Sequence, residues 1–203
     1  DARLLAGAGC HLMFAPSVEE MYPDGFATSI AVAGPALGLE GDARPQMFGG
    51  VALVVTKLFN QVQPDVAVFG EKDYQQLMVV RQFVRDLDLP IQIVGSPTER
   101  DGWGLALSSR NAYLSEDELA IARRLNGVLA EAGARASAGE PIDGVESDAA
   151  EALLQAGFAS VDYVAIRRAE DLGSFGGVVD APARILTAAW LGKTRLIDNM
   201  AVG

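Results

Sequence analysis

The sequence predicts an α/β fold in its first half and a small α+β domain in its second half. Within residues 66–94, an apolar run, a helical pattern and a second apolar run follow one another, which is the order of a βαβ unit in a doubly wound parallel sheet. Residues 115–200 instead carry two helical patterns followed by three strand-like runs. We expect the boundary near residue 98, which divides the chain into domains of residues 1–98 and 99–203.

The βαβ unit is supported by the residue spacing around its first strand. Val66–Phe69 follows the helix breaker Pro64-Asp65 and predicts a buried parallel strand. Glu71–Leu87 has the apolar spacing of a helix, and Ile91–Val94 is the next strand. Another helix is predicted before the unit, because apolar side chains in residues 48–63 recur on one helical face: Val51, Val54, Val55, Leu58, Phe59 and Val62.

Two short strands and a turn are expected further upstream. His11–Ala15 is an apolar run ended by Pro16, which predicts a buried strand, and Ser29–Ala33 predicts a second one. Between them, Met21–Gly25 contains Pro-Asp-Gly, in which a fixed φ is followed by a permissive residue, so we expect a turn.

The second half begins with a polar, glycine-containing loop, Thr98–Asn111. Ser115 and Glu118 have the spacing of a capping box, so we expect a helix from Ser115 to about Ala136. A turn or linker over Gly139–Gly144 and a shorter helix around Ser147–Gln155 follow. The remaining strands are predicted at Val161–Ile166, Arg184–Trp190 and Thr194–Met200, with the last two forming a hairpin that turns at Gly192.

Composition excludes several classes of protein. The net charge of −11 argues against non-specific nucleic-acid binding, which depends on basic surface. The apolar runs are far shorter than the ~18 residues that a membrane span needs, and no basic, hydrophobic signal segment opens the chain. Cys10 is the only cysteine and His11 the only histidine, which disfavours disulfides, cysteine metal clusters, zinc sites and Ser-His-Asp triads. We therefore expect a cytoplasmic protein.

The end of the first predicted strand carries the first candidate site. The carboxyl ends of strands in open α/β sheets bind ligands, and a helix amino terminus favours an anion. Gly70 would let a ligand approach the backbone, Lys72 adds a positive charge, and Asp73 can accept hydrogen bonds from sugar hydroxyls. Gln76 lies one turn beyond Lys72 on the same side. Taken alone, the stretch could also be an ordinary solvent-facing first helical turn.

The second candidate site is the loop segment Gly104–Asn111. Ser108 and Ser109 supply hydroxyls, and Arg110 can form two hydrogen bonds to phosphate oxygens at once. Taken alone, this stretch could equally be a polar loop that caps the following helix.

Four motifs in order resemble pantothenate synthetases. They are Phe14–Pro23 (FAPSVEEMYP), Gly70–Gln76 (GEKDYQQ), Gly104–Asn111 (GLALSSRN) and Ala188–Asn199 (AAWLGKTRLIDN). Each motif is several residues long, and together they span almost the whole chain. The resemblance implies an AMP-forming ligase that joins pantoate to β-alanine with ATP through a pantoyl adenylate, releasing pyrophosphate and then AMP. It also implies an amino-terminally truncated Rossmann-like nucleotidyltransferase domain, a small carboxyl-terminal lid, Mg²⁺ with ATP, and a homodimer at full length.

The resemblance also implies roles for individual residues. Catalytic roles fall on Lys72, which would meet charge on the α-phosphate, and on Ser108, Ser109 and Arg110, which would hold phosphates. Nucleotide contacts fall on Phe69, Gly70, Glu71, Lys72, Asp73, Glu99, Leu107, Ser108, Ser109 and Arg110. Gln76 and Arg44 would face pantoate. No protein ligand for a metal is implied.

Three departures from the family pattern stand out. The family's His-x-Gly-His signature is absent, so we expect roughly a third of the enzyme upstream and little synthetase activity from this chain alone. Arg44–Phe48 reads Arg-Pro-Gln-Met-Phe, with Met47 in place of a histidine, and Trp103 replaces an aspartate before Gly104. Alternative hypotheses are a relative that activates a different carboxylic acid, a non-catalytic nucleotide-binding copy, and an α/β domain without a small-molecule site.

Overall fold

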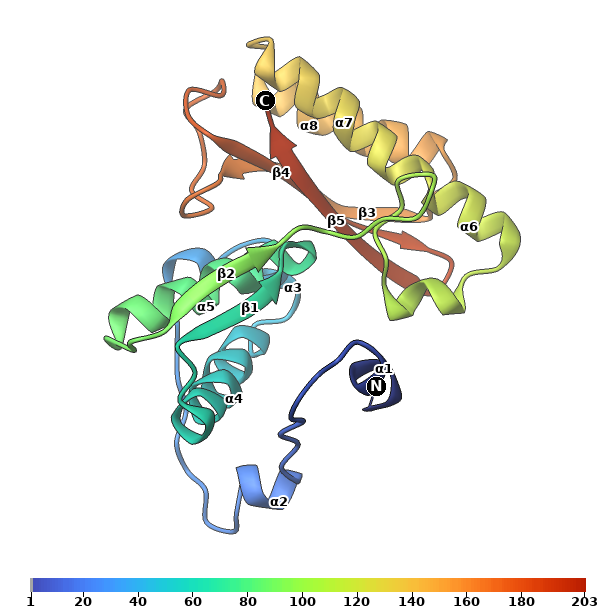
Figure 1. Ribbon diagram of the computed structural model, residues 1–203. Coiled ribbons are helices and arrows are strands. Elements are labelled where there is room, and N and C mark those ends of the chain that lie inside the picture. The colour runs from blue at the N-terminus through green and yellow to red at the C-terminus, as the bar shows by residue number, and fades with distance from the viewer. Residues whose placement is uncertain (1) are drawn as a thin grey trace.

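A two-stranded parallel sheet lies in the first half of the chain. In the computed structural model, which describes residues 2–203, β1 (Val66–Gly70) pairs with β2 (Gln92–Ser96) from Val66↔Gln92 to Gly70↔Ser96. Helix α5 (Tyr74–Asp86) connects them, and α4 (Met47–Val62) packs beside α5 (Figure 1). The predicted βαβ unit and the helix before it are therefore confirmed.

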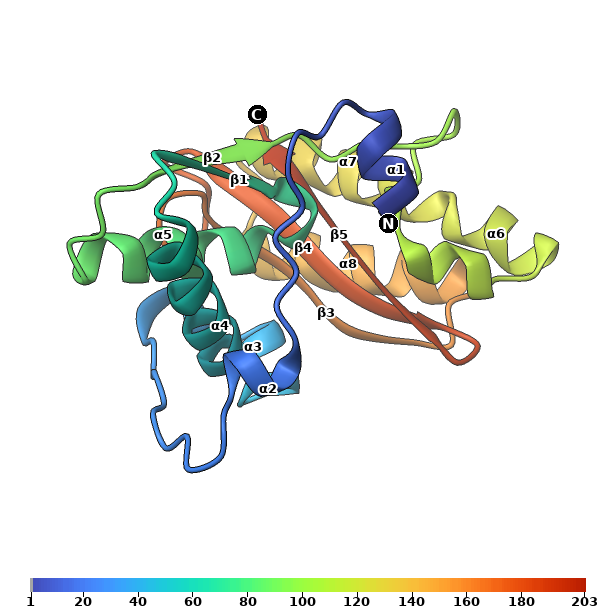
Figure 2. The ribbon, with the colours of Figure 1, turned by 60° about the horizontal axis from the view of Figure 1, so that its bottom comes forward.

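Helices cover only one face of this sheet. Figure 2 shows α4 and α5 on the same side of β1 and β2, where their apolar side chains form a core with Phe69 and Ile93. On the other face, the side chains of Val66 and Val68 are 49% and 65% exposed. The expectation that this strand is buried is wrong on that face, because successive side chains of a strand alternate between faces and the described residues pack against one of them.

The segment before α4 contains short helices rather than strands. These are α1 (Ala2–Gly7), α2 (Val18–Met21), the 3₁₀ turn η1 (Gly34–Ala36) and α3 (Glu40–Ala43). The strands predicted at residues 11–15 and 29–33 are wrong: neither segment pairs with another strand within residues 2–203. Apolar runs favour extended backbone, but a strand also needs a hydrogen-bonded neighbour that local sequence cannot reveal.

The turn predicted at Met21–Gly25 is confirmed. The N–H of Phe26 donates to the carbonyl oxygen of Pro23 at 3.0 Å, and Gly25 has a φ of +82°, a conformation that glycine adopts without steric cost.

The second half is a three-stranded antiparallel sheet with helices on one face. Strands β3 (Ser160–Arg168), β4 (Ala183–Leu191) and β5 (Thr194–Val202) lie in that order, and α7 (Arg124–Ser137) and α8 (Ile142–Gln155) pack against them (Figure 1). The α/β and α+β halves of the predicted fold class are thus confirmed. None of the helices in residues 2–203 is long and apolar enough to cross a membrane.

Boundaries in this half differ from the predictions at two places. The Ser115–Glu118 capping box starts α6 (Glu116–Ala122) as expected, but the helix is interrupted at Arg123 before α7 begins. Helix α8 starts at Ile142, five residues earlier than predicted, so Gly144 lies inside it rather than in a linker. The hairpin is confirmed, with Leu191 opposite Thr194 and Gly192 at a φ of +55°.

The uncovered face of the antiparallel sheet packs against the first half of the chain. Tyr163 and Leu186 of this sheet form a small apolar cluster with Tyr74, Leu77 and Met78 of α5. This cluster places the end of β1 next to β4 and β5, and the candidate site lies where they meet.

Candidate functional site

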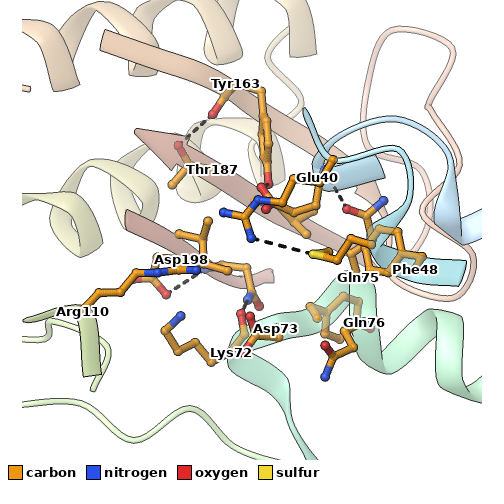
Figure 3. Close-up of a pocket in the computed structure, with 16 residues that line it drawn as sticks. Glu40, Phe48, Lys72, Asp73, Gln75, Gln76, Arg110, Tyr163, Thr187 and Asp198 are labelled. Atoms are coloured by element: carbon orange, nitrogen blue, oxygen red, sulfur yellow. Dashed lines mark hydrogen bonds between the residues drawn. The ribbon is translucent and has the colours of Figure 1, made fainter. Parts of the chain in front are cut away.

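A cleft lies between the two halves of the chain (Figure 3). Side chains of α3, α4, α5, β3, β4 and β5 line it, together with two 3₁₀ turns, η2 (Glu71–Asp73) and η3 (Ser109–Tyr113). A second, smaller cavity shares Lys72, Arg110 and Asp198 with it. The residues that line the cleft thus come from both halves.

The end of β1 delivers the first set of predicted residues. Lys72, Asp73 and Gln76 all line the cleft, as their spacing predicts. The helix does not begin directly after Gly70, however. The turn η2 comes first, and α5 begins at Tyr74. Lys72 therefore projects from a tight turn between the strand and the helix.

Gly70 is open on the side where a side chain would project. A Cβ built on it would meet no other atom within 4 Å, and its φ of −68° and ψ of 134° suit any residue. The protein's own packing does not require glycine here, so the free space can be used by a ligand.

Other residues of the first stretch are already engaged. The Phe69 ring packs edge-on against Phe59, with ring centroids 6.3 Å apart. The Glu71 carboxylate forms an ion pair with Arg184 at 3.0 Å. For both residues, the side chain serves the fold and only the backbone is available at the end of the strand.

The second stretch reaches the site in part. Arg110 lines the cleft and, with Ser108, the smaller cavity. The Ser108 hydroxyl caps η3 by accepting from the N–H of Arg110 at 3.2 Å. Ser109 is exposed and lines neither space. Earlier in the loop, the Glu99 carbonyl accepts from the N–H of Leu107 at 2.8 Å, and the Leu107 side chain is exposed.

The cleft is locally positive although the chain is acidic. Arg44, Lys72 and Arg110 line it and have no carboxylate within 4.0 Å among residues 2–203. Two of its three acidic residues, Asp198 and Glu40, form ion pairs with arginines. The third, Asp73, has no such partner among residues 2–203. The cations without an ion-pair partner thus outnumber the one such carboxylate, which favours an anionic ligand.

The ammonium of Lys72 lies in an environment that disfavours its charge. Figure 3 shows it beneath Arg110, with Asp73 nearby. Burial lowers the pKa of Lys72, Asp73 opposes that effect, and the Arg110 guanidinium lowers the pKa further, so that it falls below its ordinary value. An anion bound between Lys72 and Arg110 would stabilise the charged ammonium and so raise the pKa of Lys72 again.

A buried ion pair forms one wall of the cleft, and sequence patterns did not reveal it. The Arg195 guanidinium donates two hydrogen bonds to the Glu40 carboxylate, at 2.7 and 2.8 Å, and the Tyr163 hydroxyl donates a third at 2.9 Å. Burial alone would raise the pKa of Glu40, but these hydrogen bonds hold it below its usual value. Burial and the neighbouring carboxylate raise the pKa of the Tyr163 hydroxyl, so it remains a donor.

Gln75 also lines the cleft and was missed. Its amide nitrogen donates to the carbonyl oxygens of Pro35 and Gly38 at 3.0 and 3.1 Å, and its oxygen accepts from the N–H of Glu40 at 2.9 Å. The available signal was a polar residue beside Gln76 at a position that faces the apolar side of the helix. Gln75 thereby joins α5 to the segment that carries Glu40.

The two substituted positions have partners within the chain. The Met47 sulfur lies 3.8 Å from a guanidinium nitrogen of Arg44. The Trp103 ring is 68% exposed and stacks on Arg123, whose guanidinium carbon lies 3.7 Å from the ring centroid. Trp103 therefore stacks on Arg123 and does not line the cleft. Among residues 2–203, no group of three or more His, Cys, Asp and Glu side chains is placed to hold a metal ion.

Comparison with known proteins identifies the family. The family model described as pantoate-beta-alanine ligase matches residues 1–201. The pantothenate synthetase of Caulobacter vibrioides is 59% identical over the whole chain, which covers 72% of that protein. That of Mesorhizobium japonicum is 57% identical, again over the whole chain and 71% of the relative.

Solved structures agree with the sequence relatives. A pantothenate synthetase from Thermus thermophilus matches with a TM-score of 0.90 and 48% identity, over 99% of this chain and 73% of the other. A pantoate-beta-alanine ligase from Francisella tularensis, solved with beta-gamma ATP and beta-alanine, matches with a TM-score of 0.78 and 31% identity, over 99% and 68% of the two chains. The resemblance inferred from four motifs is confirmed, and the chain belongs to the pantoate–β-alanine ligase family.

Proposed function

We propose that the cleft is where this ligase activates pantoate, with Lys72 and Arg110 as the cations that bind the reacting phosphates. The reaction is that of the family, the ATP-dependent condensation of pantoate with β-alanine to pantothenate. The observation that carries the proposal is the convergence of two cations in one cleft, one from each half of the chain, neither with an ion-pair partner among residues 2–203.

The chemistry needs positive charge at this place. In the first step, a carboxylate oxygen of pantoate attacks the α-phosphorus of ATP, and the bond to the β-phosphate oxygen breaks, so pyrophosphate leaves. In the second step, the amine of β-alanine attacks the acyl carbon, loses a proton, and AMP leaves. Negative charge builds on α-phosphate oxygens during the first step, and a fixed cation stabilises it best where water is excluded. Lys72 is the partly buried cation in that position.

Residues next to Lys72 and in the loop before Arg110 are assigned to the adenosine part of ATP. We assign the backbone of Phe69, Gly70 and Glu71, with the Asp73 carboxylate, to adenosine and its ribose. The backbone of Glu99 and the exposed side chain of Leu107 would contact the adenine side, since both belong to the loop that leads to Arg110. The nucleotide then lies along the end of β1 and across the loop.

Phosphate and pantoate contacts complete the assignment. The Ser108 hydroxyl lies beside the cavity shared by Lys72 and Arg110. Ser109 would contact the phosphates through its backbone N–H at the first position of η3, because its side chain is exposed to solvent. Gln76 and Arg44 are the hydrogen-bond donors in the cleft that we assign to pantoate.

Magnesium, a homodimer and a cytoplasmic location belong to the same proposal. Mg²⁺ in nucleotide sites is held mainly by phosphate oxygens and water, with one or two carboxylates. The phosphates of ATP and water would therefore hold Mg²⁺, and the Asp73 carboxylate stays assigned to the ribose. Dimerisation and location rest on the family motifs and on a single exposed cysteine that suits a reducing compartment.

The test is steady-state AMP formation from ATP, pantoate and β-alanine by the complete polypeptide. Lys72→Ala is expected to lower kcat by about 10³-fold with a smaller change in the ATP KM, as for loss of one preorganised electrostatic group. Arg110→Ala is expected to impair both parameters. Lys193→Ala, which removes an exposed lysine in the β4–β5 turn, is the matched control. Wild-type turnover by Lys72→Ala would disprove the assignment.

A further inference from the structure

The last sequence motif, Ala188–Asn199, ends in an asparagine whose role the reaction does not explain. Asn199 lies on β5 and is only 2% exposed. Its amide nitrogen donates to the carbonyl oxygens of Glu71 and Lys72, at 3.0 and 2.8 Å. A side chain from the second half of the chain thus binds the turn that carries the proposed catalytic lysine.

The two acceptors flank a single residue. The Glu71 carbonyl belongs to the peptide plane before the Cα of Lys72, and the Lys72 carbonyl belongs to the plane after it. With both planes held by one amide group, the φ and ψ of Lys72 are set, and so is the direction of its Cα–Cβ bond. Since η2 is only three residues long, it lacks the continuous hydrogen-bond ladder of a longer helix, and these two hydrogen bonds hold it from the second half.

Asn199 is itself held rigidly. Its side-chain oxygen accepts from the Arg184 Nε at 2.5 Å, and its backbone N–H donates to the Asp198 carboxylate at 2.7 Å. Arg184 also pairs with Glu71 at 3.0 Å and stacks over the Tyr74 ring at 3.9 Å. Both polar atoms of the Asn199 side-chain amide are therefore hydrogen-bonded: the nitrogen donates twice and the oxygen accepts once.

We infer that Asn199 is a positioning residue that aims Lys72 at the reacting phosphate. We assign it no contact with a reacting atom. Asn199 lies on β5. Lys72 therefore reaches its working position only when the second half of the chain is docked against the first. The inference rests on the proposed role of Lys72.

The test compares Asn199→Asp and Asn199→Ala with the wild type in the complete polypeptide. Aspartate keeps an acceptor for Arg184 but presents an acceptor to the two carbonyls, so the turn loses both hydrogen bonds. We expect kcat to fall by about 10- to 100-fold in both variants, as for a misplacement of about 1 Å, while the KM for ATP changes by less than about threefold. A milder variant, Asn199→Ser, gives the same comparison if Asn199→Ala does not fold.

A double-mutant cycle separates positioning from general stability. In a Lys72→Ala background, measured by AMP formation at high enzyme concentration, the Asn199→Asp change is expected to cost less than about twofold, because there is no ammonium left to aim. Tyr74→Phe is the control for docking: it removes another hydrogen bond between the halves, from the Tyr74 hydroxyl to the Ala169 carbonyl at 2.7 Å, but leaves Asn199 in place. It is expected to change kcat by less than about threefold.

Each outcome decides a different claim. An equal loss from Asn199→Asp in the presence and absence of Lys72, or a change confined to KM, would overturn the positioning role. A slow Lys72→Ala variant combined with wild-type kcat in the Asn199 variants would overturn this inference alone. Wild-type kcat in Lys72→Ala would instead overturn the proposed function from which it starts.

Discussion

Replacing Glu40 by glutamine tests whether the two halves are joined by the buried ion pair. Glu40 is 6% exposed and Arg195 is 7% exposed. Glutamine keeps the shape but loses the charge and turns one acceptor into a donor that faces the guanidinium. Breaking a buried pair by removing one partner costs about 3–5 kcal/mol. Because Arg195 retains Asp162 at 2.7 Å, we expect the lower part of this range, about 3 kcal/mol.

The assay is urea unfolding of the wild type and Glu40→Gln at pH 7. Glu140→Gln is the matched control, since it removes a carboxylate at an equal distance, 2.7 Å from Arg135, at the protein surface. It is expected to change the free energy of unfolding far less than Glu40→Gln does, because water screens exposed pairs. A loss below about 1 kcal/mol for Glu40→Gln would refute the view that this pair joins the halves.

The same variant predicts a change in pH dependence. The folded pKa of Glu40 is lowered below its ordinary value of 4.5. Its contribution to stability is therefore fully present above pH 4.5 and is lost as the pH falls through the lower folded pKa. Unfolding measured from pH 6 downward should show a shallower loss in Glu40→Gln than in the wild type. Parallel curves would contradict the assigned shift.

Two further predictions concern the nucleotide side of the cleft. Gly70→Ala is expected to leave the free energy of unfolding unchanged or to raise it by up to about 1 kcal/mol, since the backbone at this position suits alanine. It is also expected to raise the ATP KM by at least about tenfold, since a methyl group would fill the ligand's space. An unchanged KM in steady-state assays would contradict this. The lowered pKa of Lys72 in the free protein predicts that kcat/KM for ATP falls with rising pH below the ordinary lysine value of 10.5, and that Lys72→Arg, if active, shifts this loss to higher pH. Identical profiles of kcat/KM against pH would count against Lys72.

Local sequence patterns predicted the elements whose cause is local. The apolar spacing of α4, the capping box at Ser115 and the turn at Gly192 all depend on residues within a few positions of one another, and the structure confirms them. The strands predicted at residues 11–15 and 29–33 failed because pairing is a long-range property. The domain boundary near residue 98 stays a prediction.

The candidate site divides in the same way. Lys72 and Gln76 were found because their turn follows a recognisable strand, and Arg110 because its loop carries a motif. Glu40 was missed because its partner lies 155 residues away in the sequence. Phe69 and Glu71 were identified by motif, but only the structure shows that their side chains are occupied by the fold.

The most direct test of the account is pantoate-dependent exchange of labelled pyrophosphate into ATP. This reaction isolates the first step, because it needs ATP and pantoate but no β-alanine. The complete polypeptide is expected to catalyse exchange with pantoate alone, and Lys72→Ala to lose it while still binding ATP. Exchange that requires β-alanine, or that proceeds at the wild-type rate without Lys72, would contradict the claim that this cleft forms the acyl adenylate through Lys72.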